Sequence, residues 1–389
     1  MTNKRPFLLL ALLSAFPPLS TDMYLPVIPM LVKLWHQPLS IVNLTLVGFF
    51  VSYCLFLLFY GPLSDRLGRR GPLLAGIGIF IMGSLLCALS NHVATLIVFR
   101  VIQAAGAASA SALALAISKD VYEGYERERI LAYISVIIAL APMLAPVFGG
   151  WLLAWVSWRW IFVLQGGIGA VAWIGVFRMP ESLKERADTG VWQTVGIYYQ
   201  LLQNRRYLGF ALMMAILVLP AFAFIGGAAD IYITHFGVSE QTFGYFFAFN
   251  AMAIMAGSFA CTRLLRRVGS QRLLTAGFTL ILVGSIALIF NRLPGPWALA
   301  LPMAMVSFAF GLSRPPSNNL VLEQVDRYAG AASSLLIFSY FMIGAFSMWL
   351  ISLQWQDKIH VIGVLGTGSS AMVLFFWFLV AQRAISNSR

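Results

Sequence analysis

The sequence predicts an all-α membrane protein with twelve transmembrane helices in two six-helix bundles and both termini in the cytoplasm. Of its 389 residues, 60% are hydrophobic and only 10% are charged, whereas soluble domains are about 45–50% apolar and about 25% charged. The chain therefore lacks the polar surface needed to cover a soluble core. This composition excludes a soluble enzyme, a disordered protein and a nucleic-acid binder in solution.

Twelve apolar runs are long enough to cross a bilayer, for which about 20 mostly apolar residues are needed. In chain order, and with edges defined to within a few residues, they are 6–32, 40–62, 72–91, 93–117, 130–154, 160–178, 207–232, 242–264, 271–291, 296–320, 329–353 and 359–381. The loops and tails that remain average about ten residues each. No soluble catalytic domain fits into them.

The positive charges determine the expected orientation. The net charge of +12 comes from 26 Lys and Arg residues against 14 Asp and Glu residues. With the N-terminus inside, twenty of the 26 fall in cytoplasmic segments, four fall on the opposite side, and Arg100 and Arg314 lie within spans. Such an excess in short loops marks the cytoplasmic side. The basic charge thus reports membrane topology, and nucleic acid is not expected as a partner.

The apolar start of the first span also has the composition of a secretory signal over Phe7–Ala15. Cleavage after such a signal would remove Asp22, change the parity of the spans and spoil the charge pattern. The twelve-span interpretation keeps this segment.

The longest polar stretch, Met179–Arg206, divides the chain into two sets of six spans. We therefore expect an N-terminal bundle at 1–178, a cytoplasmic linker at 179–206 and a C-terminal bundle at 207–389. Val195, Tyr198 and Leu202 in the linker recur at helical spacing, which predicts an amphipathic helix on the membrane surface; a plain solvated linker is the alternative. Parallel six-span repeats are typical of transporters, which bind substrate near the midplane between the repeats.

The sequence contains no motif for nucleotide hydrolysis, metal binding or disulfide formation. No lysine stands in a phosphate-binding G-x-x-x-x-G-K-[ST] loop, and the four histidines fall at or near predicted outer loops. The three cysteines, Cys54, Cys87 and Cys261, lie within spans and suggest no disulfide framework. We expect neither a metal nor a cofactor, which leaves an ion gradient as the energy source.

Ionisable residues inside a bilayer are costly and point to function. Asp22 lies about 24 Å along the first span, and Arg100 lies about 10 Å from the opposite edge of the fourth. In a core of about 30 Å these depths nearly coincide, so we expect the two side chains to pair, with Gln103 one turn from Arg100. Our hypothesis makes Asp22 the exchangeable proton site and Arg100 the residue that sets its proton affinity. A static ion pair is the alternative.

Two further charges occur in the second half. Asp230 is expected at the outer interface as a solvated carboxylate, about 34 Å along the seventh span. Arg314 precedes Pro315 and Pro316, which interrupt a helix and free backbone carbonyls. It either faces a cavity or extends toward the cytoplasmic interface near Glu323.

Four motifs resemble those of the major facilitator superfamily. The loop at residues 61–70 reads GPLSDRLGRR and resembles the signature loop of that superfamily. Residues 20–26 (STDMYLP), 96–103 (LIVFRVIQ) and 145–151 (APVFGGW) resemble motifs of its proton-coupled drug exporters, with Ala104 and Ala145 where many members have Gly. The closest likeness is to the bicyclomycin and chloramphenicol resistance subfamily of bacterial drug:proton antiporters.

The resemblance implies roles for three groups of residues. A cytoplasmic gate would include Gly61, Asp65, Arg66, Gly68, Arg69 and Arg70. Close packing that limits leakage would involve Pro146, Gly149 and Gly150. A cavity for apolar compounds would be lined by Tyr24, Tyr53, Tyr133, Phe222, Phe249, Asn250, Arg314 and Phe341. The alternatives are arginines that only fix topology, glycines that only pack, and aromatic rings that face lipid.

The resemblance therefore implies a monomeric secondary transporter of the bacterial inner membrane. It would export small amphipathic compounds such as antibiotics in exchange for protons by alternating access, with the bilayer, the substrate and protons as its partners and no cofactor. Two alternatives are an exporter of an endogenous metabolite, such as a siderophore, sugar or amino acid, and a polytopic membrane enzyme or scaffold. Import is a further alternative, which the motif at 145–151 disfavours.

Overall fold

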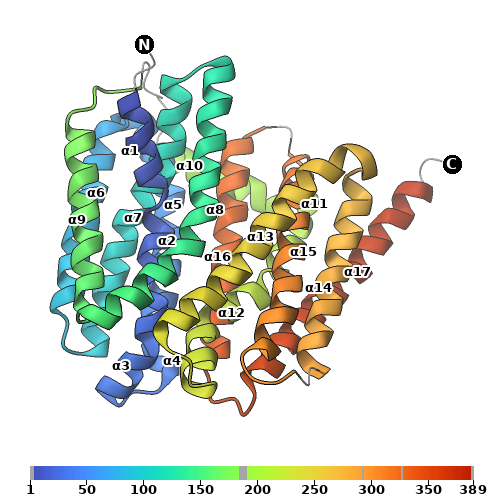
Figure 1. The fold of residues 1–389 in the computed structure, drawn as a ribbon. Helices are drawn as coiled ribbons and strands as arrows, with labels where there is room; N and C mark the ends of the chain where they lie inside the picture. The colour runs from blue at the N-terminus through green and yellow to red at the C-terminus, as the bar shows by residue number, and fades with distance from the viewer. Residues whose placement is uncertain (1–3, 184–190, 291–292, 326, 387–389) are drawn as a thin grey trace. The chain divides into compact units, whose positions relative to one another are not determined.

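The computed structural model describes residues 4–183, 191–290, 293–325 and 327–386, and every regular element in these ranges is a helix (Figure 1). The chain forms two compact units. Unit 1 comprises Met1–Gln200 and Val238–Tyr245, and unit 2 comprises Leu201–Gly237 and Phe246–Arg389. Residues 184–190 of the predicted linker lie outside the described residues.

The predicted helical spans are present. Among the described residues, eleven helices are long and apolar enough to cross a membrane. The helix pair Phe7–Ser14 and Phe16–Trp35, which is bent by 42°, provides a twelfth span when it is counted as one. The expectation of a twelve-span, all-α membrane fold is thereby confirmed.

Unit 1 contains the first six spans. Its elements are α1 (Lys4–Ser14), α2 (Phe16–Thr21), the 3-10 helix η1 (Asp22–Val27), α3 (Ile28–Trp35), α4 (Leu39–Val42), α5 (Leu44–Leu67), α6 (Arg70–Leu89), α7 (Val93–Val121), α8 (Gly124–Trp155) and α9 (Arg159–Phe177). Helix α7 packs against α5 and α6, α6 also packs against α9, and α8 packs against η1. Small residues allow these approaches: a methyl group on Gly106 of α7 would lie 2.3 Å from the Phe80 backbone N of α6.

The first span is broken where the polar residues lie. Pro17 and Pro18 occupy the first turn of α2, and Pro26 stands inside η1. Proline has no N–H to donate and therefore favours a helix start and interrupts a helix interior. The span consequently changes from α-helix to 3-10 helix at Asp22, whereas its 42° bend lies at Ala15, between α1 and α2.

Unit 2 contains the remaining spans. Its elements are α11 (Arg205–Ile216), α12 (Leu219–Ala229), the π-helix η2 (Asp230–His235), most of α13 (Glu240–Val268), α14 (Ser270–Phe290), α15 (Trp297–Leu322), α16 (Ala329–Ile351) and α17 (Lys358–Ser386). Helix α14 packs against α15 and α17, and α16 packs against α11 and α12.

The expectation of a solvated carboxylate at Asp230 is wrong. The Lys358 Nζ lies 2.5 Å from the Asp230 Oδ2, and the two side chains are only 16% and 18% exposed. Lys358 begins α17 and is brought to the end of α12 by the packing of these two helices. Pairing offsets the cost of partly burying each charge.

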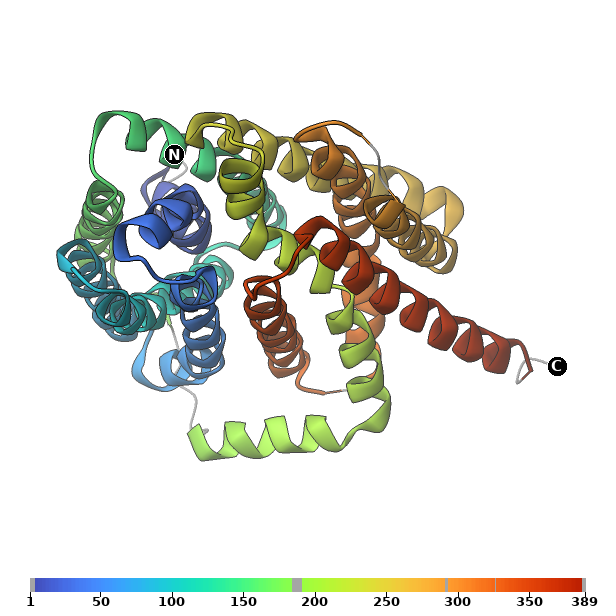
Figure 2. The ribbon, with the colours of Figure 1, turned by 90° about the horizontal axis from the view of Figure 1, so that it is seen from below.

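The linker forms the predicted helix, α10 (Val191–Gln203). In Figure 2, which views the spans of unit 1 nearly end-on, α10 lies across their direction. The Tyr198 hydroxyl donates to the Leu58 carbonyl oxygen at 3.2 Å and holds α10 against α5, whereas Val195, Tyr199 and Leu202 are exposed. An apolar exposed stripe suits a membrane surface, and that location remains a prediction.

Candidate functional site

A buried carboxylate stands at the break in the first span. Asp22 begins η1 and is only 7% exposed. The Thr21 hydroxyl donates to the Asp22 Oδ1 at 3.0 Å and to the Pro17 carbonyl oxygen at 3.0 Å. A carboxylate inside a membrane span is costly unless a proton or a cation neutralises it, so Asp22 is the first candidate functional group.

Arg100 of α7 lies close to this break but does not pair with Asp22. Its side chain is fully buried, and the Nη1 donates to the Ser20 carbonyl oxygen at 3.0 Å and to the Gln103 Oε1 at 2.6 Å. The expected contact with Gln103 is thus present. No ion pair joins Arg100 to Asp22 within the described chain, so the expected pairing is wrong for this state. The reason is local: the last carbonyls of α2 lack helical partners, and the guanidinium satisfies one of them.

Aromatic rings surround the rest of the guanidinium. Its central carbon lies 4.3 Å from the ring centroid of Phe49, 4.9 Å from that of Tyr24 and 5.7 Å from that of Phe162. The Nε and Nη2 atoms are buried without a hydrogen-bond partner. Rings attract a cation weakly compared with a carboxylate, so Arg100 keeps two donors uncommitted next to the break.

Gln165 of α9 completes the polar cluster, and the sequence analysis missed it. The Gln103 Nε2 donates to the Gln165 Oε1 and to the Ser84 hydroxyl, each at 2.8 Å, and the Gln165 Nε2 donates to the Leu19 carbonyl oxygen at 3.0 Å. Arg100 and Gln165 therefore bind two successive carbonyls at the end of α2. Gln165 is the sole amide in its predicted span, and that signal could have identified it.

The fifth-span glycines bring α8 directly onto the backbone beside Asp22. A methyl group on Gly149 would lie 2.3 Å from the Met23 carbonyl oxygen, and one on Gly150 would lie 2.4 Å from the Glu240 carbonyl oxygen at the start of α13. The Pro146 carbonyl oxygen would lie 3.0 Å from a methyl group on Gly244. The close packing expected for this motif is therefore a feature of unit 1.

A second charged cluster lies at the ends of α5 and α6. Arg69 forms ion pairs with Asp65 and with the Asp120 Oδ2 at 2.8 Å, and its Nη1 donates to the Ser64 hydroxyl at 2.7 Å. Burial alone would lower the pKa of the Arg69 guanidinium, but the hydrogen bond to Asp120 and the charge of Asp65 raise it above its ordinary value. Arg69 thus joins the ends of α5 and α7 as a permanent cation.

Glu181, after α9, caps the start of α6. Its Oε1 accepts from the Arg69 backbone N–H at 2.8 Å, and its Oε2 accepts from the Arg70 N–H at 3.1 Å. Burial would raise the pKa of this carboxyl, but four backbone N–H donors, those of Leu183, Arg69, Arg70 and Ser182, hold it below the usual value. A carboxylate at a helix N-terminus is stabilised by the helix dipole as well.

The other gate residues differ in their environments. Gly68 has φ of +96°, and a methyl group there would lie 2.5 Å from the Glu181 Oε2, so glycine is required for the turn. The Arg70 Nη2 donates to the Phe177 carbonyl oxygen at 2.5 Å. Arg66 is exposed, and a methyl group on Gly61 would meet no atom within 4 Å. Arg66 thus stands outside the cluster, whereas the Gly61 carbonyl oxygen accepts from the Ser64 hydroxyl at 2.8 Å.

The predicted cavity residues are spread over both units. Tyr24 is buried with its hydroxyl 2.9 Å from that of Thr45, and Tyr53 is buried and stacks on Phe49 with centroids 6.2 Å apart. Tyr133 is 43% exposed on α8.

In unit 2 the predicted set is again divided. Phe222 packs edge-on against Phe341 at 5.9 Å, Phe249 packs against Trp297 at 6.0 Å, and the buried Asn250 donates to the Phe246 carbonyl oxygen at 3.2 Å. Of the predicted cavity residues, Arg314 lines the cleft described next.

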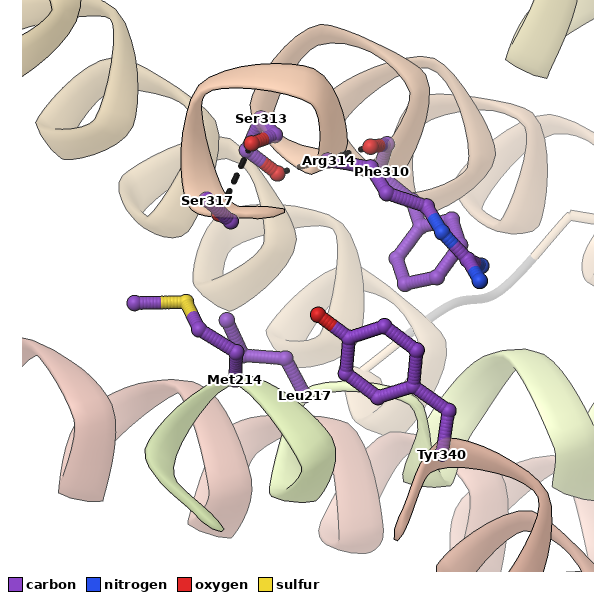
Figure 3. A pocket seen from close by; sticks show the side chains of 7 residues that line it. All are labelled: Met214, Leu217, Phe310, Ser313, Arg314, Ser317 and Tyr340. Atoms are coloured by element: carbon purple, nitrogen blue, oxygen red, sulfur yellow. Dashed lines mark hydrogen bonds between the residues drawn. The ribbon is translucent and has the colours of Figure 1, made fainter. Parts of the chain in front are cut away.

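Figure 3 shows this partly enclosed cleft in unit 2. Helix α15 lies along one side, with residues of the α11 end and of α16 facing it. The lining residues are Met214, Leu217, Phe310, Ser313, Arg314, Ser317 and Tyr340. The Arg314 guanidinium carbon lies 5.0 Å from the Phe310 centroid and 4.9 Å from the Tyr340 centroid. Of the two alternatives for Arg314, the structure therefore favours the cavity.

Known proteins are similar to this chain in sequence and in fold. The sequence profile of the Major Facilitator Superfamily matches residues 10–348. An uncharacterized MFS-type transporter, YdgK, of Bacillus subtilis (strain 168) is 31% identical over 387 residues, which cover 98% of this chain and 96% of that protein. A bicyclomycin resistance protein homolog of Haemophilus influenzae is 27% identical, with 98% and 97% covered. The crystal structure of a D-xylose–proton symporter matches with a TM-score of 0.76 at 14% identity, over 95% of this chain and 96% of that one, which shows the fold.

These matches confirm the family and subfamily resemblance that the four motifs indicated. They also agree with the apolar helical spans and with the polar side chains buried among them. The membrane enzyme alternative loses its support, because the relatives that match over nearly the whole chain are named as a transporter and a resistance protein. The chain belongs to the major facilitator superfamily, and it is a transporter rather than an enzyme.

Proposed function

We propose that this transporter exports small amphipathic compounds, including antibiotics, across the bacterial inner membrane in exchange for protons. It acts as a monomer by alternating access, with both termini in the cytoplasm. The observation that carries this proposal is the buried Asp22 at a broken helix, beside a buried arginine that keeps two donors uncommitted. The name of the bicyclomycin resistance relative supports the substrate class.

Asp22 carries the proton in this mechanism, and Arg100 responds to its charge. While Asp22 is protonated, Arg100 stays bound to the Ser20 carbonyl oxygen and Gln103. When Asp22 loses its proton, the carboxylate attracts the uncommitted Nε and Nη2 donors, because an opposite charge nearby favours the ionised form. The contact that holds the end of α2 then breaks. A change of charge at Asp22 is thereby converted into a movement of the first span.

The proton gradient supplies enough energy for useful export. One charge moving across the membrane contributes about 2.3 kcal/mol per 100 mV, and each pH unit contributes about 1.36 kcal/mol. One proton therefore supports a concentration ratio of a few orders of magnitude. The gate residues regulate access in this scheme: Asp65, Arg69 and Asp120 hold the ends of α5, α6 and α7 together in one state.

Transport by purified protein in liposomes tests the coupling. With an imposed pH gradient and a panel that includes bicyclomycin, chloramphenicol and cationic dyes, the wild type should accumulate substrate against its concentration gradient. We expect Asp22→Asn to abolish this accumulation while it retains exchange of labelled for unlabelled substrate, because exchange needs no net proton movement.

Asp357→Asn is the matched control. Asp357 is exposed, and its Oδ1 accepts from the Ile359 and His360 N–H groups at the start of α17. Asparagine also caps helices well, so this variant should transport like the wild type. Undiminished pH-driven accumulation by Asp22→Asn refutes the assignment of the proton to Asp22.

A further inference from the structure

The cleft in unit 2 contains a cation without a counter-charge among the described residues. Arg314 lies eight residues before the end of α15 at Leu322, about 12 Å along the helix axis. No ion pair or hydrogen bond to its guanidinium exists within the described residues, and its contacts are the rings of Phe310 and Tyr340. A charge inside a membrane span is costly unless it is paired, so the cleft favours a ligand that brings a negative charge.

The hydroxyl groups that line the cleft already donate hydrogen bonds within the protein. The Ser313 hydroxyl donates to the Ala309 carbonyl oxygen at 2.8 Å, and the Ser317 hydroxyl donates to the Ser313 carbonyl oxygen at 2.7 Å. The Tyr340 hydroxyl donates to the Asn318 Oδ1 at 2.8 Å. Among the side chains that line the cleft, the uncommitted donors are therefore those of Arg314.

The backbone that carries Arg314 is fixed despite its two prolines. Pro315 removes the N–H that the Gly311 carbonyl would accept in an unbroken helix. The Ser258 hydroxyl of α13 donates to this carbonyl oxygen instead, at 3.3 Å. Arg314 is thus held in place by its helix and two rings, and its guanidinium offers paired donors that match a carboxylate.

We propose that this cleft binds the carboxylate end of an amphipathic organic anion. Arg314 hydrogen-bonds the carboxylate, while Met214 and the rings of Phe310 and Tyr340 contact the apolar part. The cleft is only partly enclosed, so it holds one end of the molecule and the rest extends out of it. This inference rests on the proposed function, for which it names a substrate class.

Equilibrium binding to the purified full chain tests it without any transport step. Isothermal titration calorimetry in an uncharged detergent compares 1-naphthaleneacetate with 1-naphthaleneacetamide, two probes of the same shape that differ in charge. We expect the wild type to bind the carboxylate at least about tenfold more tightly than the amide, because charge-assisted bonds are the stronger ones.

Three variants locate the preference. Arg314→Met should bring the affinity for the carboxylate down to that for the amide. Arg314→Lys, which keeps the charge but loses the paired geometry, should retain part of the preference and covers the case in which the methionine variant does not fold. Arg263→Gln is the control, because Arg263 also stands over a ring, that of Phe259 at 4.9 Å, but is exposed and outside the cleft; it should bind like the wild type.

Several outcomes overturn the proposal. Equal binding of the two probes by the wild type does so, and so does a carboxylate preference that persists in Arg314→Met. Displacement of 1-naphthaleneacetate by stoichiometric phosphatidylglycerol assigns the cleft to a lipid phosphate instead. Since no proton gradient is present, a failure of proton coupling in liposomes leaves this binding result standing, and the two failures are distinguishable.

Discussion

A methyl group at position 149 tests whether α8 has to touch the backbone that carries Asp22. In Gly149→Ala, the new Cβ would lie 2.3 Å from the Met23 carbonyl oxygen, and ordinary contact begins at 3.4 Å. Helix α8 and η1 must therefore separate by about 1 Å, since the obstructing atom is backbone. Forcing extra volume into a packed interior costs about 1–3 kcal/mol. We expect this loss of stability together with at least about tenfold slower proton-driven transport, because the displaced segment includes Asp22, the proposed proton site.

Gly167→Ala provides the comparison. Gly167 lies on α9, and a methyl group there meets no atom within 4 Å. Alanine is favoured over glycine in a helix by about 1 kcal/mol, so this variant should be as stable as the wild type or slightly more stable. Thermal unfolding in detergent followed by fluorescence measures both variants, and liposome uptake measures transport. If Gly149→Ala unfolds at the same temperature as Gly167→Ala and transports normally, the close approach is not required and the reasoning is refuted.

Two other substitutions probe the contacts that the sequence analysis missed. Glu181→Ala should lower stability at neutral pH by about 0.3–1 kcal/mol, the usual contribution of a charge at a helix N-terminus. Folding lowers the pKa of this carboxyl. The extra stability of the wild type over the variant should therefore be complete above the unfolded-state pKa of about 4.3 and disappear as the pH falls through the folded-state pKa. Unfolding curves between pH 3 and pH 7 measure it, and a stability difference that grows toward acid would contradict this expectation. Gln165→Leu leaves the Leu19 carbonyl oxygen without its donor and should lower stability by about 1–3 kcal/mol, as measured by thermal unfolding. The control is Gln354→Leu, at an exposed position, which should change stability by less than about 0.5 kcal/mol. Equal effects of the two substitutions would show that the buried amide network does not stabilise the protein.

Much of the fold follows from the sequence because a membrane span can be identified from the hydrophobicity of its own residues. An apolar run of sufficient length predicts a helix without knowledge of its neighbours. The contact between Arg100 and Gln103 was also predictable, because residues three apart on a helix are neighbours. Each of these inferences depends on residues that are close together in the chain.

The partners that join distant segments were harder to predict. Depth in the membrane placed Asp22 and Arg100 at one level, but depth says nothing about the rotation of a helix or about free carbonyls at a broken end. For that reason the Arg100 guanidinium donates to the Ser20 carbonyl oxygen and not to Asp22. Glu181 and Asp120 bind Arg69 from 112 and 51 residues away, and no local pattern connects them. Tyr133 is exposed on α8, and its assignment to a cavity stays a prediction, since an aromatic ring in a span is as compatible with a lipid-facing surface as with a cavity.

Arg100 and Arg314, taken with both proposals, determine how export would draw on the membrane potential. Exchange of a neutral compound for one proton moves one positive charge inward, whereas exchange of a monoanion for one proton moves two. At about 2.3 kcal/mol per charge per 100 mV, the anion gains about 4.6 kcal/mol per 100 mV. The contribution of the pH gradient stays at about 1.36 kcal/mol per pH unit, because one proton crosses in either case. Since Arg314 has no acidic partner among the residues that the structure describes, binding an anion there requires no second titratable group. Asp22 can then remain the sole proton carrier while the voltage drives anionic substrates more strongly than neutral ones.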